Sequence, residues 1–162
     1  MGQIMSLSSR ASEALNSLGT FSQDERRLEC AADGDRLQCT LLAVDTLACA
    51  FQTLDVTVAA LASAPLTQLK QTAESLSRRL TYLLEPIGPV EIDADQCVVQ
   101  LRSTPPQKSE NGTYYYELLV ANGGRLSLCR FVKEPGEVRR QIPAQVTREV
   151  FLRLVGDLAA AK

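Results

Sequence analysis

Apolar residues recur at helical spacing between residues 66 and 85. The members of this stripe, at steps of four, three, four and three, are Leu69, Ala73, Leu76, Leu80 and Leu83. That spacing places them on one face of an α-helix. Pro65 suits a first helical turn and Pro86 cannot continue one, because proline has a fixed φ and no N–H. The pattern therefore predicts a helix over residues 66–85, and strand-like segments lie on both sides of it.

Two further stretches show helical spacing, one near each end of the chain. In the first, apolar residues fall at positions 7, 11, 14, 15 and 18, and Gly19 is a natural stop, which predicts a helix over residues 8–18. In the second, the stripe consists of Val146, Val150, Leu154 and Leu158. Pro143 is expected to open this last helix. Leu152 falls outside the stripe, which indicates contact with a second surface.

Residues 26–40 alternate between apolar and polar and contain the pair Asp-Gly at 33–34. This pair favours the type I′ turn whose twist matches two antiparallel strands. Folding about the turn places Cys30 opposite Leu37 and gives the hairpin one apolar and one polar face. A third strand is expected within the apolar, β-branched run at 46–58.

The second half of the chain predicts about four more strands. Residues 90–93 and 97–102 are short strand-like runs on either side of a turn. Residues 103–112 are rich in proline, serine and charge, and we expect an exposed loop there. Residues 114–121 and 125–132 then form a second hairpin through an Asn-Gly turn.

Three consecutive tyrosines open the first strand of that second hairpin. Tyr114 and Tyr116 share one face of the strand and Tyr115 lies on the other, and both faces are partly apolar. This predicts a central strand covered on two sides. Two interpretations remain open: the tyrosines fill the sheet, or they bind a partner, since tyrosine is favoured at interfaces. The candidate binding residues are Tyr114, Tyr115, Tyr116 and Leu152.

These elements predict an α+β fold, a twisted antiparallel sheet with helices packed on it. The expected order is helix, three strands, helix, about four strands, helix. The 162 residues suit one domain, 1–162, with a flexible start at 1–7.

Composition excludes several classes of function. There is no histidine, which removes histidine-based triads and the commonest zinc ligand. The net charge of −2 and the aromatic fraction of 5% argue against a nucleic-acid binder. The five cysteines form no C-x-x-C pair, and we expect free buried thiols in a reducing, cytoplasmic compartment.

No motif indicates a cofactor, a metal or a catalytic residue. The pairs at Asp33-x-Asp35 and Asp93-x-Asp95 lack the further oxygen ligands of a calcium loop. The apolar run at 41–64 contains two aspartates, so we expect no membrane span. The first six residues, Met-Gly-Gln-Ile-Met-Ser, match a short myristoylation pattern that arises often by chance.

In element order, size and acidity the chain resembles the small acidic secretion chaperones, a dimeric class that holds partner proteins in extended form. The strands at 90–102 depart from that order. The resemblance implies a chaperone-like homodimer. Our leading hypothesis is a non-enzymatic interaction module that binds another protein or itself. The alternative is a small-ligand binder or an enzyme that uses carboxylates and tyrosine hydroxyls in a cleft between sheet and helix.

Overall fold

The computed structural model describes residues 5–19 and 22–161. Its helical elements are α1 (Leu7–Ser17), the 3-10 turn η1 (Ala59–Leu61), α2 (Leu66–Arg79) and α3 (Arg148–Ala159). Its strands are β1 (Arg26–Ala32), β2 (Asp35–Val44), β3 (Ala48–Thr57), β4 (Ile87–Asp93), β5 (Val98–Ser103), β6 (Gln107–Lys108), β7 (Thr113–Ala121), β8 (Arg125–Lys133), β9 (Arg140–Ile142) and β10 (Ala144–Thr147). The predicted α+β class and the overall order of helices and strands are confirmed.

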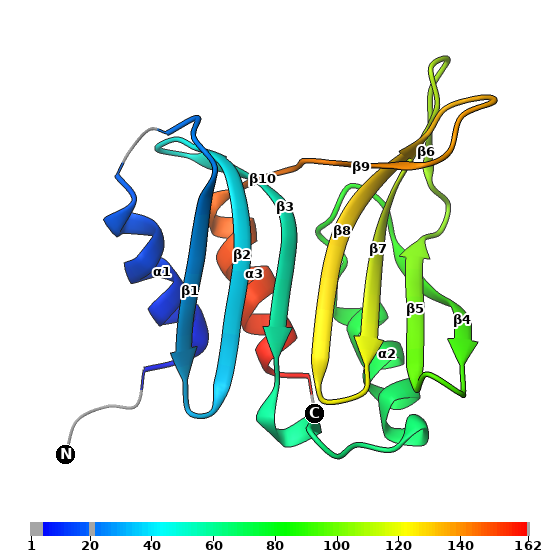
Figure 1. Cartoon of the computed structure of the whole chain (residues 1–162), viewed down its shortest axis with the longest axis horizontal. Helices are drawn as coiled ribbons and strands as arrows, with labels where there is room; N and C mark the ends of the chain where they lie inside the picture. Colours follow the sequence, from blue (N-terminus) through cyan, green and yellow to red (C-terminus); the bar gives the residue numbers. More distant parts are fainter. Residues whose placement is uncertain (1–4, 20–21, 162) are drawn as a thin grey trace.

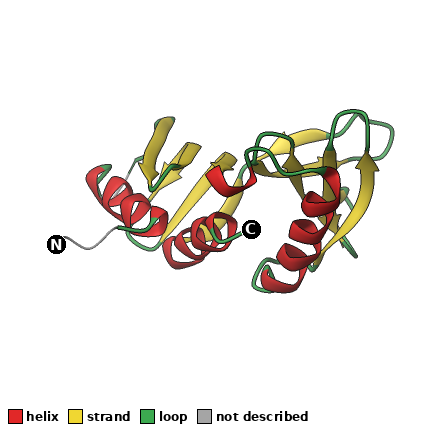
Figure 2. Ribbon diagram, turned by 90° about the horizontal axis from the view of Figure 1, so that it is seen from below, coloured by secondary structure: helices red, strands yellow, loops and turns green. Residues whose placement is uncertain are grey.

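All the strands join one antiparallel sheet, in the order β1-β2-β3-β8-β7-β5-β4 along its main path. In Figure 1 the strands stand in front of α2 and α3, and α1 is seen next to β1; Figure 2 shows all three helices on one side of the sheet. Within the described residues no helix covers the opposite side, which we call the open face. The chain therefore has two layers, and the sheet has one buried and one accessible surface.

The first hairpin has the predicted register. Cys30 pairs with Leu37 and Leu28 with Cys39, about a turn in which Asp33 has φ 52°. A type I′ turn requires positive φ at both central positions, and Asp-Gly tolerates it. Leu28, Leu37 and Cys39 are buried against the helices, so the apolar face of this hairpin lies toward the core.

The second hairpin turns through residues 122–124. Gly124 has φ 79°, and its carbonyl oxygen accepts the N–H of Val58 at 2.8 Å. A Cβ atom at Gly124 would lie 2.4 Å from the Val58 carbonyl oxygen, whereas one at Gly123 would meet nothing within 4 Å. The close approach of two backbones therefore requires glycine at position 124.

A gap in the middle of the sheet is filled from the end of the chain. β3 and β8 pair only from Leu54–Thr57 to Arg125–Leu128 and then separate. Figure 1 shows the segment of β9 and β10 across this opening, where β9 pairs with β8 and β10 with β3. The last helix therefore begins at Arg148, and the prediction that Pro143 opens it was wrong. The backbone of β10 finds its hydrogen bonds in β3 instead, and Thr147 caps the helix by accepting the N–H of Val150 at 3.0 Å.

The central helix is shorter than predicted: α2 ends at Arg79 and not at residue 85. Leu80 has ψ 66° and turns the chain back toward the sheet. Glu85, the last residue of the predicted helix, lies outside α2 and is buried. Its carboxylate forms an ion pair with Arg130 of β8, described below.

The chain start and the predicted loop differ in detail from expectation. Residues 1–4 of the expected flexible start lie outside the described residues, together with most of the myristoylation pattern, whereas Leu7 begins α1 and is buried. Within residues 103–112, Ser103 is the buried end of β5 and β6 pairs with β7. Most of the remaining positions in that loop are exposed.

The core lies between the sheet and the three helices. Leu15 of α1, Leu76 of α2 and Phe151 of α3 are almost completely buried in one continuous cluster. The Phe51 and Phe151 rings pack with centroids 6.1 Å apart, which ties β3 to α3. In the part of the chain that the structure describes, none of the helices has both the length and the apolar character needed to cross a bilayer.

Candidate functional site

The open face carries a compact group of aromatic and charged side chains over β5, β7 and β8. Alternation along β7 places Tyr115 and Glu117 on the open face. Phe131 of β8 is directly opposite Tyr115, and Arg102 of β5 is opposite Glu117. Arg139, in the turn before β9, reaches over the same surface. We call these five residues the aromatic–arginine cluster.

Ion pairs and stacked rings hold the cluster in place. Glu117 Oε2 accepts from Arg139 Nη1 at 2.5 Å and from Arg102 Nε at 3.3 Å. The Tyr115 and Phe131 rings stack at 5.8 Å, with the Arg102 guanidinium 5.3 Å from the first ring and that of Arg139 4.0 Å from the second. The hydrogen bond to Glu117 raises the pKa of Arg139 above its ordinary value, so this side chain stays cationic. The Glu117 side chain is only 8% exposed and is committed to two guanidinium groups.

A cleft of about 700 Å³ lies beside the cluster. Its lining residues come from four strands and two loops: Val90, Arg102, Ser103, Thr104, Pro106, Thr113, Tyr115, Lys133, Val138 and Arg139. Three of them are cationic and none is acidic. Val90 and Val138 are 55% and 87% exposed, which is high for branched apolar side chains. The cleft thus combines positive charge with accessible apolar surface.

Of the candidate binding residues from the sequence, the structure brings Tyr115 into this cleft. Tyr116 points to the helix side, where it is 1% exposed beneath the Arg130 guanidinium, and alternation puts the half-buried Tyr114 on that side too. Leu152 is half-buried at the contact between α3 and α1, where its carbonyl oxygen accepts from Ser8 Oγ at 3.0 Å. A binding role for these four residues stays a prediction.

Sequence reasoning missed the other members of the cluster. Two of them carried a signal, because Arg102 and Glu117 are charged residues within strands that are largely apolar. A charge in such a strand needs either solvent or a partner. Arg139 and Phe131 carried none, since a residue in a turn and an aromatic residue in a strand are both common.

A second buried ion pair lies on the helix side of the sheet. Arg130 donates to Glu85 through Nη1 at 2.9 Å and Nη2 at 3.3 Å. Ser103 Oγ also donates to Glu85, at 2.7 Å, and accepts the backbone N–H of Tyr116 at 2.7 Å. Because Glu85 and Glu117 lie on opposite sides of the sheet, the two buried carboxylates do not form an acid–base pair. Each is a structural anchor for arginine.

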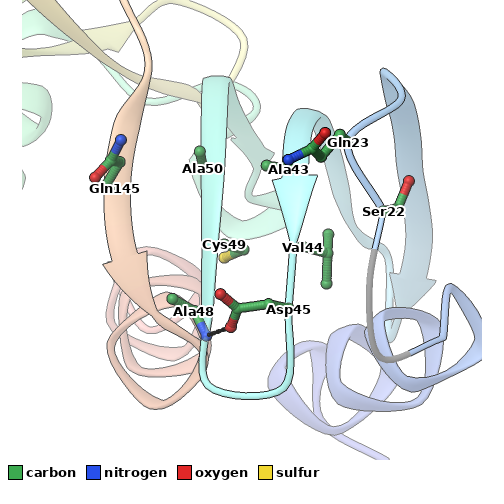
Figure 3. Close-up of a pocket in the computed structure, with 9 residues that line it drawn as sticks. All are labelled: Ser22, Gln23, Ala43, Val44, Asp45, Ala48, Cys49, Ala50 and Gln145. Atoms are coloured by element: carbon green, nitrogen blue, oxygen red, sulfur yellow. Dashed lines mark hydrogen bonds between the residues drawn. The ribbon is translucent and has the colours of Figure 1, made fainter.

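A smaller pocket of about 250 Å³ lies at the far end of β2 and β3 (Figure 3). Its one carboxylate, Asp45, accepts the N–H groups of Leu47 and Ala48 at 2.8 and 2.7 Å, and these bonds lower its pKa. Burial raises the pKa of the Cys49 thiol to about 12, so a reactive thiolate does not form near neutral pH. The Asp45 carboxylate is therefore engaged in the turn between β2 and β3, and the Cys49 thiol belongs to the core.

The remaining groups that could bear chemistry are dispersed. All five cysteines are free, with Cys39 and Cys49 buried and the other three half-exposed, so the expectation of uniformly buried thiols was only partly right. Among the described residues no group of three or more cysteine, aspartate or glutamate side chains is placed to hold a metal.

The chain matches no protein-family model, no curated protein and no solved structure. The resemblance to secretion chaperones therefore rests on element order, size and acidity alone.

Proposed function

We propose that this protein is a non-enzymatic, cytoplasmic interaction module that binds a segment of a partner protein on the open face of its sheet. One observation carries the proposal: the cleft of the open face combines Tyr115, which is stacked on Phe131 beside the cleft, with two arginines and exposed valines. Aromatic residues and arginine are enriched at the centres of protein interfaces, where they supply most of the binding energy. In the described part of the chain, no helix covers this side of β5, β7 and β8 (Figure 2).

The state of the buried acidic groups supports binding over catalysis. A general base must be free to accept a proton from a substrate. Glu117 already accepts two arginine donors, and Glu85 accepts from arginine and serine. In both places these contacts occupy the carboxylate oxygens that a general base would need to have free.

Self-association is part of the proposal, in keeping with a chaperone-like module. Ile92, which is 47% exposed, lies on β4 at the edge of the sheet. A two-fold mate that pairs with this edge would satisfy its open backbone groups, and two-fold dimers are the commonest oligomers. Light scattering over a dilution series should give a mass twice 17.7 kDa at micromolar concentration. A constant mass near 17.7 kDa would contradict the homodimer.

Selection from a random peptide display library tests the binding function. We expect short peptides to be enriched on the wild-type protein and to lose affinity for a Val90→Asp/Val138→Asp variant, which places carboxylates on the apolar part of the cleft. Leu47→Asp is the matched control, because Leu47 is 77% exposed and lies at the turn between β2 and β3, outside the cleft. If no peptide is enriched, or if both variants lose binding equally, the proposed site is wrong.

A further inference from the structure

We infer that the cleft of the open face selects extended acidic segments, in which a carboxylate lies two residues from an aromatic or branched apolar side chain. This inference rests on the proposed function and names the chemistry of the partner. Three features of the cleft carry it: its charge, the free donors of its arginines and the placement of its apolar side chains.

The charge of the cleft is opposite to that of the chain. The protein has a net charge of −2, yet Arg102, Lys133 and Arg139 line this one cleft without an acidic neighbour in its lining. Glu117, beneath two of these cations, neutralises a single charge. The cleft therefore keeps a positive excess that attracts a carboxylate and repels a basic segment.

The arginines hold spare hydrogen-bond donors in fixed positions. Arg102 makes its one side-chain hydrogen bond in the described part of the chain through Nε, which leaves both Nη groups for a ligand. Arg139 uses Nη1 for Glu117 and the Tyr115 hydroxyl. The guanidinium planes are already held by ring contacts and by Glu117, so a ligand carboxylate does not have to order them. A guanidinium with free Nη groups matches the geometry of a carboxylate.

The apolar side chains set the spacing. The cleft runs from β4 past β5 and β7 to β8, three strand intervals of about 4.8 Å, or about 14 Å. An extended peptide covers that distance with four or five residues. Every second side chain of the peptide would face the cleft. The first would contact Val90, the second would contact the two arginines and Tyr115, and the third would contact Val138. A peptide with an apolar, an acidic and an apolar residue at these three positions matches these contacts.

The same observations favour a peptide over a nucleic acid. A polyanion binds along a track of many cations and on exposed aromatic faces. Here the cleft supplies three cations rather than a long track, Arg125 on the same face is paired with Asp55, and the Tyr115 and Phe131 rings are stacked on each other and lie beneath guanidinium groups. A peptide carboxylate with apolar neighbours can bind the free Nη groups of Arg102 and contact the exposed Val90 and Val138.

A matched pair of peptides tests the inference. The probe is a fluorescein-labelled peptide with Phe-Ser-Glu-Ser-Val at its centre, and the control replaces its glutamate by glutamine. Fluorescence anisotropy of the full chain at physiological salt should show about tenfold weaker binding of the glutamine peptide, because the charge-assisted hydrogen bonds are lost. Arg102→Gln should weaken the glutamate peptide by a similar factor and leave the glutamine peptide nearly unchanged.

Arg125→Gln is the matched protein control. Arg125 lies on β8 and on the same open face, its side chain is 62% exposed, and it pairs with Asp55 outside the cleft. We expect less than about a twofold change in peptide affinity for this variant. Equal losses for Arg102→Gln and Arg125→Gln would overturn the inference in favour of non-specific attraction. Tighter binding of a labelled single-stranded oligonucleotide that displaces the peptide would overturn it in favour of nucleic acid.

The outcomes separate the inference from the proposed function. If the glutamate and glutamine peptides bind equally, and the Val90→Asp/Val138→Asp variant weakens both, the acidic preference is wrong while the binding surface stands. If neither designed peptide binds but library selection enriches neutral sequences at the cleft, the acidic preference is again wrong and the binding surface again stands. If no peptide of either origin binds, both proposals fail.

Discussion

Removal of the Glu85 carboxylate should destabilise the fold more than any exposed charge change. Glu85 and Arg130 are 6% and 5% exposed, and the guanidinium approaches the carboxylate through two nitrogens at 2.9 and 3.3 Å. Glu85→Ala leaves the guanidinium in the interior with Gln107 and the Tyr116 ring as its remaining partners among the described residues. It also removes the acceptor of the Ser103 hydroxyl.

The magnitude follows from the cost of an unpaired buried charge. Breaking a buried ion pair at one partner costs about 3–5 kcal/mol, a large part of the roughly 5–15 kcal/mol by which a domain is stable. Replacing both partners by apolar side chains of similar size removes the charge as well. Glu85→Leu/Arg130→Met should therefore lose less than about 2 kcal/mol, and less than Glu85→Ala alone.

Urea denaturation followed by circular dichroism measures both variants by linear extrapolation. Glu134→Ala is the control, because the Glu134–Arg140 pair has side chains 39% and 66% exposed and should contribute less than about 1 kcal/mol. If Glu85→Ala loses under 1 kcal/mol, or the double variant is less stable than the single one, then the pair is solvated and the burial argument is refuted.

The remaining predictions concern the core, the second turn and the thiols. Leu76→Ala removes a fully buried side chain of α2 and should lose about 2–5 kcal/mol in the same melt; a loss under half a kcal/mol would mean that the stripe faces solvent. Gly124→Ala should destabilise the fold more than Gly123→Ala. Both positions have positive φ, 79° and 85°, but only at 124 does the new Cβ lie 2.4 Å from a backbone carbonyl oxygen. Equal losses of stability for the two variants would contradict this clash. A thiol reagent should label Cys39 and Cys49 much more slowly than the three half-exposed cysteines, and rapid reaction at either buried site would show that the core opens there. Burial raises the pKa of Cys49 to about 12, above the value near 8.5 of an unfolded thiol, so its stabilising effect is complete below about pH 8.5 and is lost as the pH rises toward 12. Urea melts above pH 9 should show that the wild type loses up to about 1.4 kcal/mol per pH unit more than Cys49→Ala, and parallel pH profiles would refute the assignment.

Local patterns predicted most of the helices and strands of this protein and the register of one hairpin. The helical stripes at 66–85 and 8–18 predicted α2 and α1, because a 3.6-residue period needs no knowledge of distant residues. The Asp-Gly turn at 33–34 predicted the register of the first hairpin, in which Cys30 pairs with Leu37, since turn type and strand alternation together set the register.

Element ends were predicted poorly where a distant contact decides them. Helical periodicity continues past Arg79, but the chain leaves the helix so that Glu85 can reach Arg130, a residue 45 positions away. Proline at 143 is typical of a helix start, yet the gap between β3 and β8 offers backbone partners to the residues that follow it. A hydrogen bond to another strand outweighs a weak local preference.

The candidate site was decided by the tertiary structure. The sequence alone determined that Tyr115 and Glu117 share one face of a strand. It did not determine that β7 lies between β5 and β8, that the helices gather on the other face, or that the turn before β9 brings Arg139 onto Glu117. Those contacts join residues 15 to 24 positions apart. Because the strand order and the choice of covered face arise from burying the whole apolar surface at once, no local pattern encodes them.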